Sequence, residues 1–385
     1  MPSAAKADRS ASAAPRLLHV FPTFVPAGRE TRSATLMNEL SADWRHALVA
    51  IDGQVSARAL LRRPDEVATI EAPRARGVLA SILAWRKLLA RERPDLVLTY
   101  NWGAFDALAA ARSLGLPIVH HEDGFNADEA VRQVPRRLWT RRVLLRGVHL
   151  VVPSRLLAGI ARETWGLAPR LVHHIDNGVD LARYAPRDGA PQLRGRLGIP
   201  RDALVVGWLG HLRPVKNPLR FLSAMARVDA DLDAWALVVG DGPERAACEA
   251  LVARTHTLFG RVVFAGHQKD PREHLRAMDA LCISSDSEQM PIALVEAMAT
   301  ALPAVSTDVG DVRGMLGPHQ EAQIVPLAEH ETSWPLAEAI QGLLADPELR
   351  ARLGAKNRAT ALGRYGLEAM VRAHEAVWRA ALPRR

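Results

Sequence analysis

Two acidic residues stand close together in a segment that otherwise favours burial. Residues 285–299 read SDSEQMPIALVEAMA, with Glu288 before a proline and Glu296 among apolar residues. Pro291 favours the first turn of a helix, where its missing N–H is tolerated. We therefore expect Glu288 in the loop before a helix and Glu296 near the second turn. A buried, unpaired carboxylate is unfavourable, so ribose hydroxyls are one expected partner for Glu296; a solvent-facing position stabilised by the helix dipole is the alternative.

Basic side chains and glycines follow several expected strands. Arg213 and Lys216 lie in GWLGHLRPVKNP, residues 207–218, directly after an apolar run. Such groups at the carboxyl end of a strand hold phosphate oxygens, and the helix N-terminus after Pro291 offers further anion-binding N–H groups. Glycines or polar atoms recur after strands in VGDGPER (239–245), FAGH (264–267) and TDVGD (307–311). Independent turns are the alternative, but the shared position predicts a nucleotide-binding rim.

Short apolar runs alternate with helix-length segments, which predicts an α/β fold with parallel sheets and helical crossovers. The clearest helix has an apolar stripe from Val78 to Leu89 and ends at Arg93, before a proline. The expected strands are Leu17–Phe21, His46–Ile51, Leu96–Tyr100, Ile118–His121, Leu150–Pro153, Leu204–Leu209, Ala236–Val239, Val262–Ala265, Ala280–Ile283, Ala304–Ser306 and Gln323–Val325.

A linker separates two α/β units of similar size. Residues 175–186 read IDNGVDLARYAP, in which Asn-Gly is a turn signal, and a Pro/Gly/Arg-rich stretch follows as far as Pro200. We predict a disordered tail at 1–14, an N-terminal Rossmann-like domain at 15–180, a linker at 181–200 and a second domain at 201–365. Because such sheets bind ligands at the carboxyl ends of their strands, the site is expected between the two units.

Composition narrows the function classes. The chain has 385 residues, 48% hydrophobic and 24% charged, with a formal net charge of +8 that comes mostly from arginine. This balance suits phosphate-bearing ligands, anionic membranes or nucleic acid, or else reflects a general bias towards arginine. No apolar run is long enough to span a membrane, and Cys248 and Cys282 give no disulfide framework or zinc spacing. The chain start lacks a signal-peptide core, so we expect a cytoplasmic setting.

These motifs together resemble those of the family 4 glycosyltransferases, retaining enzymes with the GT-B fold. The matching pieces are LGHLRPVKN, VVGDGPER, VFAG, SDSEQMPIALVEAMA, PAVSTDVGDV and the linker IDNGVDLARY. The resemblance extends from about residue 150 to 385 and is weaker in residues 17–124. It implies two Rossmann-like domains facing each other, the first on the acceptor side and the second binding the nucleotide sugar. It also implies a final helix, 366–385, that crosses back to the N-terminal domain.

The resemblance assigns donor-side roles residue by residue. Lys216 matches the lysine that contacts the donor diphosphate, Glu296 the acid that binds the ribose, and Glu288 the acid that faces the donor sugar. Where the family usually has an arginine this chain has His211, and Arg213 nearby is the alternative phosphate ligand. The remaining donor-binding positions are the Gly-Phe-Gly counterparts Gln289, Met290 and Pro291, the following Ile292, and the rim residues Gly240, Gly242, Arg245 and Gly266.

The N-terminal half supplies acceptor-side candidates. Gly28 stands where the family usually has a Gly-Gly turn near the transferring phosphate. In the segment IVHHEDGF, residues 118–125, Asp123 takes the place of a histidine that many members carry before the glycine. His121 lies two residues earlier, so either residue is a candidate catalytic group beside Glu288; a strand histidine with satisfied hydrogen bonds is the alternative for His121.

Two further clusters of charged residues, one acidic and one basic, are candidate binding sites. Asp229, Asp231 and Asp233 resemble a metal chelate but fit a solvated loop at the opposite edge of the sheet, so we expect no metal and no cofactor. Arginines crowd one predicted helix, at positions 132, 136, 137, 141, 142 and 146, beside Trp139. The Arg132–Arg146 helix therefore suits an anionic membrane surface, a solvated helix being the alternative; no recognised motif supports nucleic acid.

We therefore predict a metal-independent hexosyltransferase that moves sugar with retention from a UDP- or GDP-sugar to a glycan or lipid-linked acceptor in cell-surface polysaccharide or glycolipid synthesis. It would be cytoplasmic or peripheral on the inner face of the membrane. The alternatives are a GT-B epimerase or phosphorylase and a non-catalytic nucleotide-sugar-binding module. A dehydrogenase is disfavoured, because no G-x-G-x-x-G segment opens a helix after a strand. The sequence names neither the sugar nor the acceptor.

Overall fold

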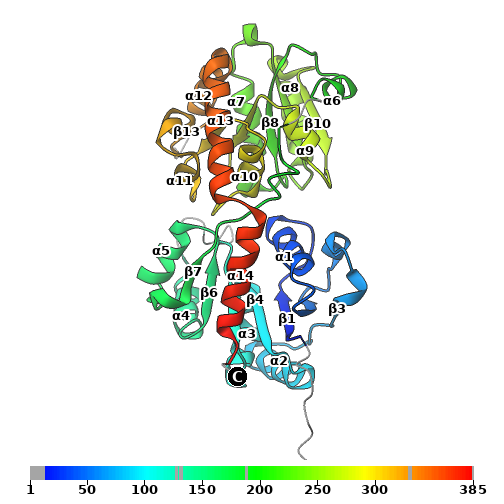
Figure 1. Cartoon of the computed structure of the whole chain (residues 1–385). Coiled ribbons are helices and arrows are strands. Elements are labelled where there is room, and N and C mark those ends of the chain that lie inside the picture. The colour runs from blue at the N-terminus through cyan, green and yellow to red at the C-terminus, as the bar shows by residue number, and fades with distance from the viewer. Residues whose placement is uncertain (1–13, 126–128, 130–132, 187–189, 328–331, 384–385) are drawn as a thin grey trace, which may run out of the picture.

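The computed structural model describes residues 14–125, 129, 133–186, 190–327 and 332–383 of the chain. The predicted tail at 1–14 therefore falls almost entirely outside the described residues. The described chain forms two lobes stacked end to end, each a parallel sheet with helices on both faces (Figure 1).

The N-terminal lobe is built on a seven-stranded sheet with the order β3-β2-β1-β4-β5-β6-β7, and all its neighbouring strands pair in parallel. Most of its strand residues are buried because helices cover both faces, and they include histidines as well as apolar residues. The strands are β1 (Arg16–Phe21), β2 (Arg45–Ala50), β3 (Ala68–Thr69), β4 (Leu96–Tyr100), β5 (Ile118–His121), β6 (His149–Val152) and β7 (Val172–His174).

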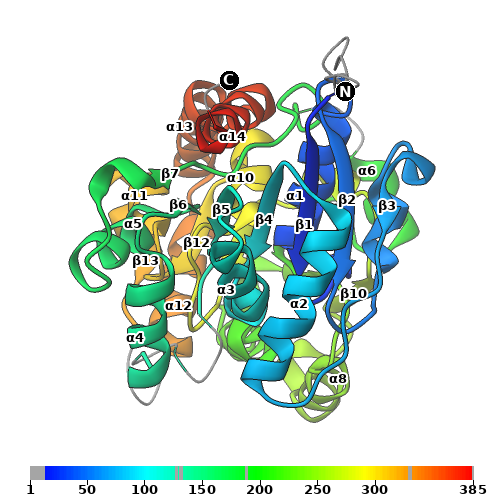
Figure 2. The same ribbon diagram turned by 90° about the horizontal axis from the view of Figure 1, so that it is seen from below.

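Two buried clusters fill the two faces of this sheet. The helices of the lobe are α1 (Gly28–Glu39), α2 (Val78–Glu92), α3 (Phe105–Ser113), α4 (Pro135–Leu144) and α5 (Arg155–Glu163). Helices α2, α3 and α5 pack on one face, while α1 and the C-terminal helix α14 (Leu367–Ala381) pack on the other (Figure 2).

The C-terminal lobe has a six-stranded parallel sheet with the order β10-β9-β8-β11-β12-β13. Its strands are β8 (Leu204–Leu209), β9 (Ala234–Val239), β10 (Val262–Gly266), β11 (Ala280–Ile283), β12 (Ala304–Thr307) and β13 (Ile324–Val325). Its helices are α6 (Ala190–Arg196), α7 (Pro218–Met225), α8 (Arg245–Arg254), α9 (Arg272–Arg276), α10 (Ile292–Ala299), α11 (Val312–Leu316), α12 (Ser333–Ala345) and α13 (Pro347–Arg364).

The chain crosses between the lobes twice. After β7 it passes into the C-terminal lobe, and after α13 it returns as α14, so that Val179 and Gly366 pair side by side in a parallel bridge. Helix α14 then completes the N-terminal core, where Trp378 is fully buried. Helix α6, which the sequence analysis placed in the linker, instead packs on the C-terminal core through Leu193.

The structure confirms every expected strand to within a residue or two, and adds the short strands β3 and β7. Helix α2 ends at Glu92, and Arg93 before the proline adopts a left-handed conformation. Trp85 and Leu89 of its expected stripe are buried, whereas Val78 is 56% exposed because it lies at the helix start, beyond the edge of the core.

Candidate functional site

Lys216 and Glu288 meet at the carboxyl edge of the second sheet. Lys216 ends the short 3-10 turn η6 (Pro214–Lys216) after β8, and Glu288 lies in the loop between β11 and α10. Their side chains form an ion pair, and the hydroxyl of Ser285 donates to Glu288 Oε1 at 2.7 Å. The structure thus brings together the two residues that the sequence assigned to the diphosphate and the sugar.

Neighbouring hydrogen bonds fix both loops, because β8 and β11 are adjacent strands. The Ser284 hydroxyl donates to the carbonyl of Asn217 at 2.8 Å and accepts from Trp208 Nε1 at 3.0 Å. Arg220 donates to the Ser284 carbonyl at 2.8 Å and pairs with Asp286 at 2.7 Å. Lys216 and Glu288 are therefore held by a polar network beneath them, which limits their movement.

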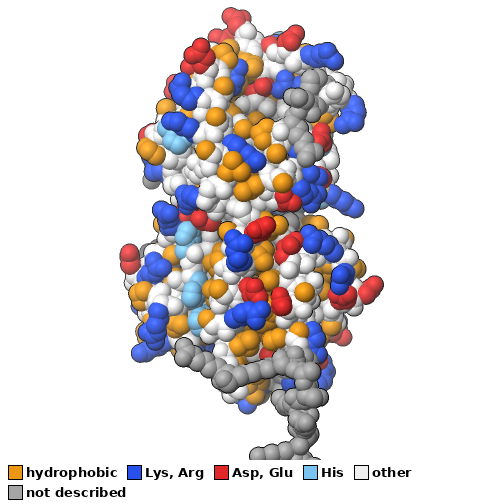
Figure 3. Space-filling view, viewed as in Figure 1, with side chains coloured by type: hydrophobic (Ala, Val, Ile, Leu, Met, Phe, Trp, Pro, Cys, Tyr) orange, Lys and Arg blue, Asp and Glu red, His pale blue; other side chains and the backbone are white. Residues whose placement is uncertain are grey.

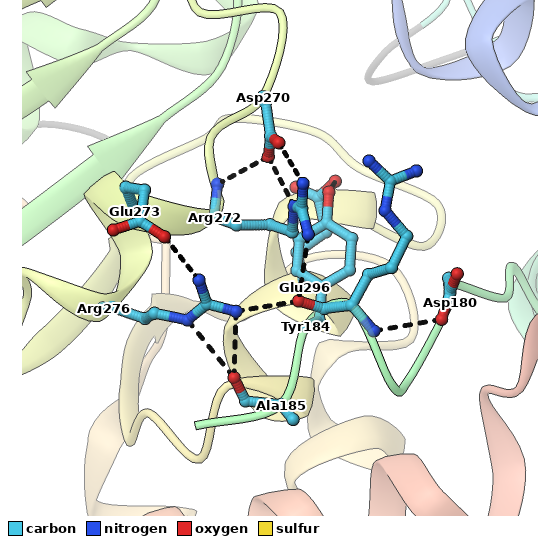
Figure 4. Close-up of polar contacts among 9 residues, drawn as sticks. Asp180, Tyr184, Ala185, Asp270, Arg272, Glu273, Arg276 and Glu296 are labelled. Carbon is cyan, nitrogen blue, oxygen red and sulfur yellow. Dashed lines mark hydrogen bonds and ion pairs between the residues drawn. The ribbon is translucent and has the colours of Figure 1, made fainter. Parts of the chain in front are cut away.

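Glu296 lies in the second turn of α10, as predicted, and its carboxylate has a protein partner. The Tyr184 hydroxyl, from the linker, donates to Glu296 Oε1 at 2.5 Å (Figure 4). Burial raises the pKa of Glu296 to about 7, although the hydrogen bond from Tyr184 opposes that rise. Glu296 is thus partly buried and paired with Tyr184, an environment that differs from both alternatives expected from the sequence.

The rim glycines allow two loops to approach closely. Gly240 and Gly242 have φ values of +137° and +156°, and a Cβ at Gly240 would lie 1.8 Å from the carbonyl oxygen of Gly210. A Cβ at Gly242 would similarly clash with the Leu212 backbone. These glycines therefore shape the loop that carries His211, which is a structural reason for them besides any donor contact.

The other two rim positions lie at the same edge of the sheet. Gly266 ends β10, has a φ of +69° and accepts a hydrogen bond from Gly240 N at 2.8 Å. Arg245 begins α8, with its guanidinium 4.5 Å from the centroid of the Phe264 ring and its Nε 2.6 Å from Glu249 Oε1. Arg245 is thus engaged within its own lobe.

His211 and Arg213 are exposed at the turn between β8 and α7. Burial and the nearby Arg213 charge lower the pKa of His211, so its imidazole is neutral near pH 7. Arg213 is thus the cationic group of this pair, beside Lys216. Basic side chains are visible on both sides of the waist between the lobes (Figure 3).

The segment in place of Gly-Phe-Gly forms contacts between the lobes. Gln289 Oε1 accepts from the Ser154 hydroxyl at 2.7 Å, and the Met290 carbonyl accepts from Asn177 Nδ2 at 3.1 Å. Gln289, Met290 and Pro291 are all buried. Their side chains therefore serve the interface between the lobes, and a donor contact there is left to backbone groups.

Helices α1 and α10 bring their N-termini together across the interface. A Cβ placed at Gly28, the first residue of α1, would lie 3.3 Å from Ile292 Cδ1, at the first residue of α10. Neither helix has a side-chain cap. Two positive dipole ends therefore lie close together at the interface, and the loop that leads into α10 carries Glu288, the partner of Lys216.

Asp123 lies on the N-terminal side of this interface, directly before Gly124. Its carboxylate pairs with Arg32 of α1 at 2.6 Å, and its N–H donates to Asn101 Oδ1 at 2.7 Å. Arg32 also donates to Asn177 Oδ1 at 3.1 Å. Asp123 is thus committed to a largely buried ion pair, and it is 13% exposed in its side chain.

His121 is buried and does not reach the surface where Asp123 lies, and its assignment as a catalytic group stays a prediction. Its side chain is 1% exposed and stacks between Tyr100 and His374, with ring centroids at 4.7 and 5.8 Å. Burial lowers the pKa of His121 well below its usual value. It lies under helix α14, whose return the strand pattern did not reveal.

The arginines predicted on one helix at 132–146 fall into different environments, and the helix itself, α4, is shorter, at Pro135–Leu144. Arg141 is 1% exposed, pairs with Glu129 at 2.8 Å and lies 5.2 Å from the ring centroids of Phe125 and Trp165. Arg137 also pairs with Glu129, at 3.1 Å. Arg136, Arg142, Arg146 and Trp139 are exposed, and Arg132 lies outside the described residues.

Asp229 and Asp233 flank the short 3-10 turn η7 (Ala230–Leu232) before β9, and Asp231 lies within it, so all three lie at the opposite edge of the sheet. All three are exposed, as predicted. Within the described ranges, no group of three or more His, Cys, Asp or Glu side chains is arranged to hold a metal ion. Cys248 and Cys282 are buried free thiols.

Neither Arg32 nor Tyr184 stands out in the sequence. Arg32 is one arginine among many in a helix, and only the fold shows that it reaches Asp123. Tyr184 stands in the quoted linker IDNGVDLARY. A tyrosine at this position is only a weak indication of a site residue, because a phenol ring in a linker is equally consistent with simple packing.

Two Rossmann-like lobes, a donor-type rim on the second sheet and a C-terminal helix that returns to the first lobe together define the GT-B class. Family models agree with this: residues 27–183 match "Glycosyltransferase Family 4" and residues 190–360 match "Glycosyl transferases group 1". The chain belongs to the family 4 glycosyltransferases, as the sequence motifs predicted.

Curated relatives and solved structures agree with this assignment. A GDP-mannose-dependent alpha-mannosyltransferase of Mycobacterium tuberculosis is 29% identical over 68% of this chain and 66% of its own length. A UDP-Gal:alpha-D-GlcNAc-diphosphoundecaprenol alpha-1,3-galactosyltransferase of Escherichia coli is 28% identical over 60% and 62%. The chain thus spans about two thirds of these relatives. HepE from Anabaena, solved with UDP and glucose, superposes with a TM-score of 0.81 at 19% identity over 95% of this chain and 100% of HepE.

Proposed function

We propose that this protein is a retaining hexosyltransferase that uses a nucleotide-diphosphate sugar as donor. The observation that carries the proposal is the convergence of Lys216, Glu288 and the open N-termini of α1 and α10 where the lobes meet. A diphosphate at this place would contact the ammonium group of Lys216 and the N-termini of two helices. Glu296, which lies on α10, would bind the ribose of the same donor.

Departure of the diphosphate is the step that these groups assist. Preorganised positive groups stabilise negative charge as it develops on a leaving group. Lys216, already in contact with Glu288, would bridge the phosphate and the acid that faces the sugar. Arg213, exposed on the same turn, would add a second cation.

Retention would proceed by attack of the acceptor on the face that the diphosphate leaves. Asp123 and Glu288 are the two carboxylates that the motifs place near the sugar, and both are engaged in ion pairs with cations. Asp123 is held by Arg32 through both carboxylate oxygens, and Glu288 is held by Lys216 and Ser285 through Oε1. The departing phosphate oxygen would then take the acceptor's proton. Product NMR should show retained anomeric configuration, and mass spectrometry should find no glycosyl-enzyme adduct.

The test of the function itself begins with donor binding. Purified protein is incubated with UDP-, GDP- and ADP-sugars, and thermal stabilisation identifies the donor that binds. The same donor is then supplied with lipid-linked and free glycan acceptors. Transfer to an acceptor supports a glycosyltransferase, donor epimerisation or phosphorolysis supports the alternative enzymes, and binding without turnover supports a non-catalytic module.

The acceptor and the setting follow from chemistry and from the relatives. The relatives' names include a diphosphoundecaprenol acceptor and a GDP-mannose donor, which supports a glycan or lipid-linked acceptor in polysaccharide or glycolipid synthesis. Among the described residues, no helix has both the length and the apolar character to cross a membrane. The proposed place is the cytoplasm or the inner membrane surface, with the exposed part of α4 as the docking element.

Metal independence is part of the same proposal. The diphosphate charge would be met by Lys216, Arg213 and two helix N-termini, which replace a divalent cation. Activity should therefore survive excess EDTA, measured as initial rate after extensive chelation. Loss of the activity with EDTA and its recovery with manganese or magnesium would contradict this expectation.

A further inference from the structure

The tyrosine that contacts the acid of α10 comes from the linker between the lobes. Tyr184 follows the bridge at Val179, and its hydroxyl donates to Glu296 Oε1 at 2.5 Å (Figure 4). It is the one described residue that donates to this carboxyl group. Glu296 therefore has one oxygen that is occupied and a second that is left for another donor.

The linker around Tyr184 is anchored at both ends. Asp180 Oδ1 accepts from the backbone N–H of residues 182 and 183 at 3.1 and 3.0 Å, which closes a turn before the tyrosine. Arg276 of α9 donates to the carbonyls of Arg183 and Ala185 at 2.8 and 3.1 Å, on either side of it (Figure 4). A phenol on such a fixed backbone has a defined position, as a positioning group requires.

We propose that Tyr184 is a positioning residue of the ribose subsite: its hydroxyl holds one oxygen of Glu296 and so orients the other towards the ribose hydroxyls. This inference rests on the proposed function, which assigns the ribose to Glu296. It goes beyond that function because it gives the linker, and not only the donor domain, a part in donor recognition.

The electrostatics give this role a measurable signature. Burial raises the pKa of Glu296 to about 7, the Tyr184 hydrogen bond lowers it, and Asp270 raises it. The elements packed around α10 carry further charged or titratable groups, which include Arg272, Glu273, His274 and Arg276 on α9 and Lys356, Arg358 and Arg364 on α13. Ribose hydroxyls donate to the ionised acid, so donor affinity should fall as the pH drops through about 7. Loss of the Tyr184 hydroxyl would raise the Glu296 pKa further and move this midpoint to higher pH.

The experiment compares Tyr184→Phe with wild type by titration calorimetry. The probes are UDP, GDP and their 2′,3′-dideoxy counterparts, each measured from pH 6 to 8.5. For the ribonucleotide that binds, the variant should show an about tenfold higher Kd, as expected for one lost hydrogen bond to a charged group, and a midpoint at higher pH. The dideoxy probe should bind both proteins equally. The matched control is Tyr365→Phe, because that hydroxyl is buried without a described partner.

Each other outcome is decisive. An unchanged Kd and midpoint in a folded Tyr184→Phe protein, with the thermal midpoint as the check on folding, would overturn the inference. Tighter ribonucleotide binding would overturn it too, because Tyr184 would then be a competitor of the ribose. In the Glu296→Gln background, Tyr184→Phe should no longer shift the pH profile; a persisting shift would assign the effect elsewhere. Wild-type protein that binds neither UDP nor GDP, nor any sugar nucleotide of the donor screen, would instead refute the donor site of the proposed function.

Discussion

At the scale of single residues, the candidate site is a set of charges that already have partners. Lys216 contacts Glu288, Asp123 contacts Arg32, and Tyr184 contacts Glu296. A donor would therefore enter a site in which positive and negative groups are balanced. Its diphosphate would share Lys216 with Glu288 and so keep the acid oriented towards the sugar. Substitutions in such pairs need a readout of folding as well as of activity.

Lys216→Ala should weaken donor binding by about 1.5–3 kcal/mol, because a charge-assisted hydrogen bond to phosphate is lost. Titration of the nucleotide-sugar donor gives the change in Kd. Lys356→Ala is the matched control, since Lys356 is exposed on α13, away from the rim. Equal donor Kd values for wild type and Lys216→Ala would remove the lysine from the donor site.

Asp123→Asn should lower kcat by on the order of a hundredfold while the donor Kd stays near the wild-type value, because a positioning group near the sugar is altered. The amide also weakens the pair with Arg32, so thermal unfolding must be measured in parallel. A large drop in the unfolding midpoint with normal turnover in the folded fraction would make Asp123 a structural partner of Arg32.

At the scale of elements, α4 shows how a row of arginines divides between the core and the surface. Arg141 is buried among aromatic rings and pairs with Glu129, whereas Arg136 and Trp139 of α4, and Arg146 just after its end, are exposed. A membrane test that replaced Arg141 would therefore confuse lost binding with lost folding, since breaking a buried pair typically destabilises a protein by about 3–5 kcal/mol.

The exposed residues give a cleaner membrane test. The triple variant Arg136→Ser, Arg146→Ser and Trp139→Ser should reduce co-sedimentation with anionic phosphatidylglycerol vesicles, and the binding of wild type should fall as salt increases. Double replacement of the exposed Arg201 and Arg254 of the other lobe removes the same two charges and so controls for net charge. Equal co-sedimentation of the α4 variant and wild type would exclude α4 as the docking surface.

At the scale of the whole molecule, α14 covers a group of buried histidines that links acidity to stability. His19 Nε2 lies 3.0 Å from His46 Nδ1, and His121 stacks on His374 of α14. Burial lowers the pKa of His46 to about 4 and that of His374 to about 3. These rings are therefore neutral in the folded protein at pH values where they would be protonated in the unfolded chain.

Stability should therefore fall in acid. Because each folded-state pKa lies below the ordinary value, the unfolded chain binds more protons between about pH 6.5 and the folded pKa. Each such histidine contributes a loss of roughly 1.4 kcal/mol per pH unit in that window and no loss above it. Urea unfolding at pH 7.5 and 5 should show a smaller difference for His374→Phe than for wild type. His256→Ala, at an exposed site, should match wild type; an equal difference in all three proteins would contradict the histidine origin.

The fold and the donor side of the site were largely predictable, because they depend on local signals. Pro291 defines the start of α10, which puts Glu296 in its second turn, and parallel strands bring Lys216 to the same edge as Glu288. The family resemblance implied the return of α14, but the contacts of His121 were not predictable, since they depend on which residues of that helix face it, more than 240 residues later in the chain. Long-range packing of this kind leaves no periodic pattern in the sequence.

The return of α14 to the first lobe also constrains the order of events during synthesis. Residues 367–381 leave the ribosome only after the whole second lobe, yet Met370, Val377 and Trp378 belong to the core of the first. The first lobe thus emerges with one sheet face covered by α1 but not yet by α14 while some 180 further residues are added, or about 9–36 seconds at ordinary elongation rates. During that interval the nascent chain exposes apolar surface of the kind that chaperones bind. The core of the first lobe is complete only after α14 has been synthesised.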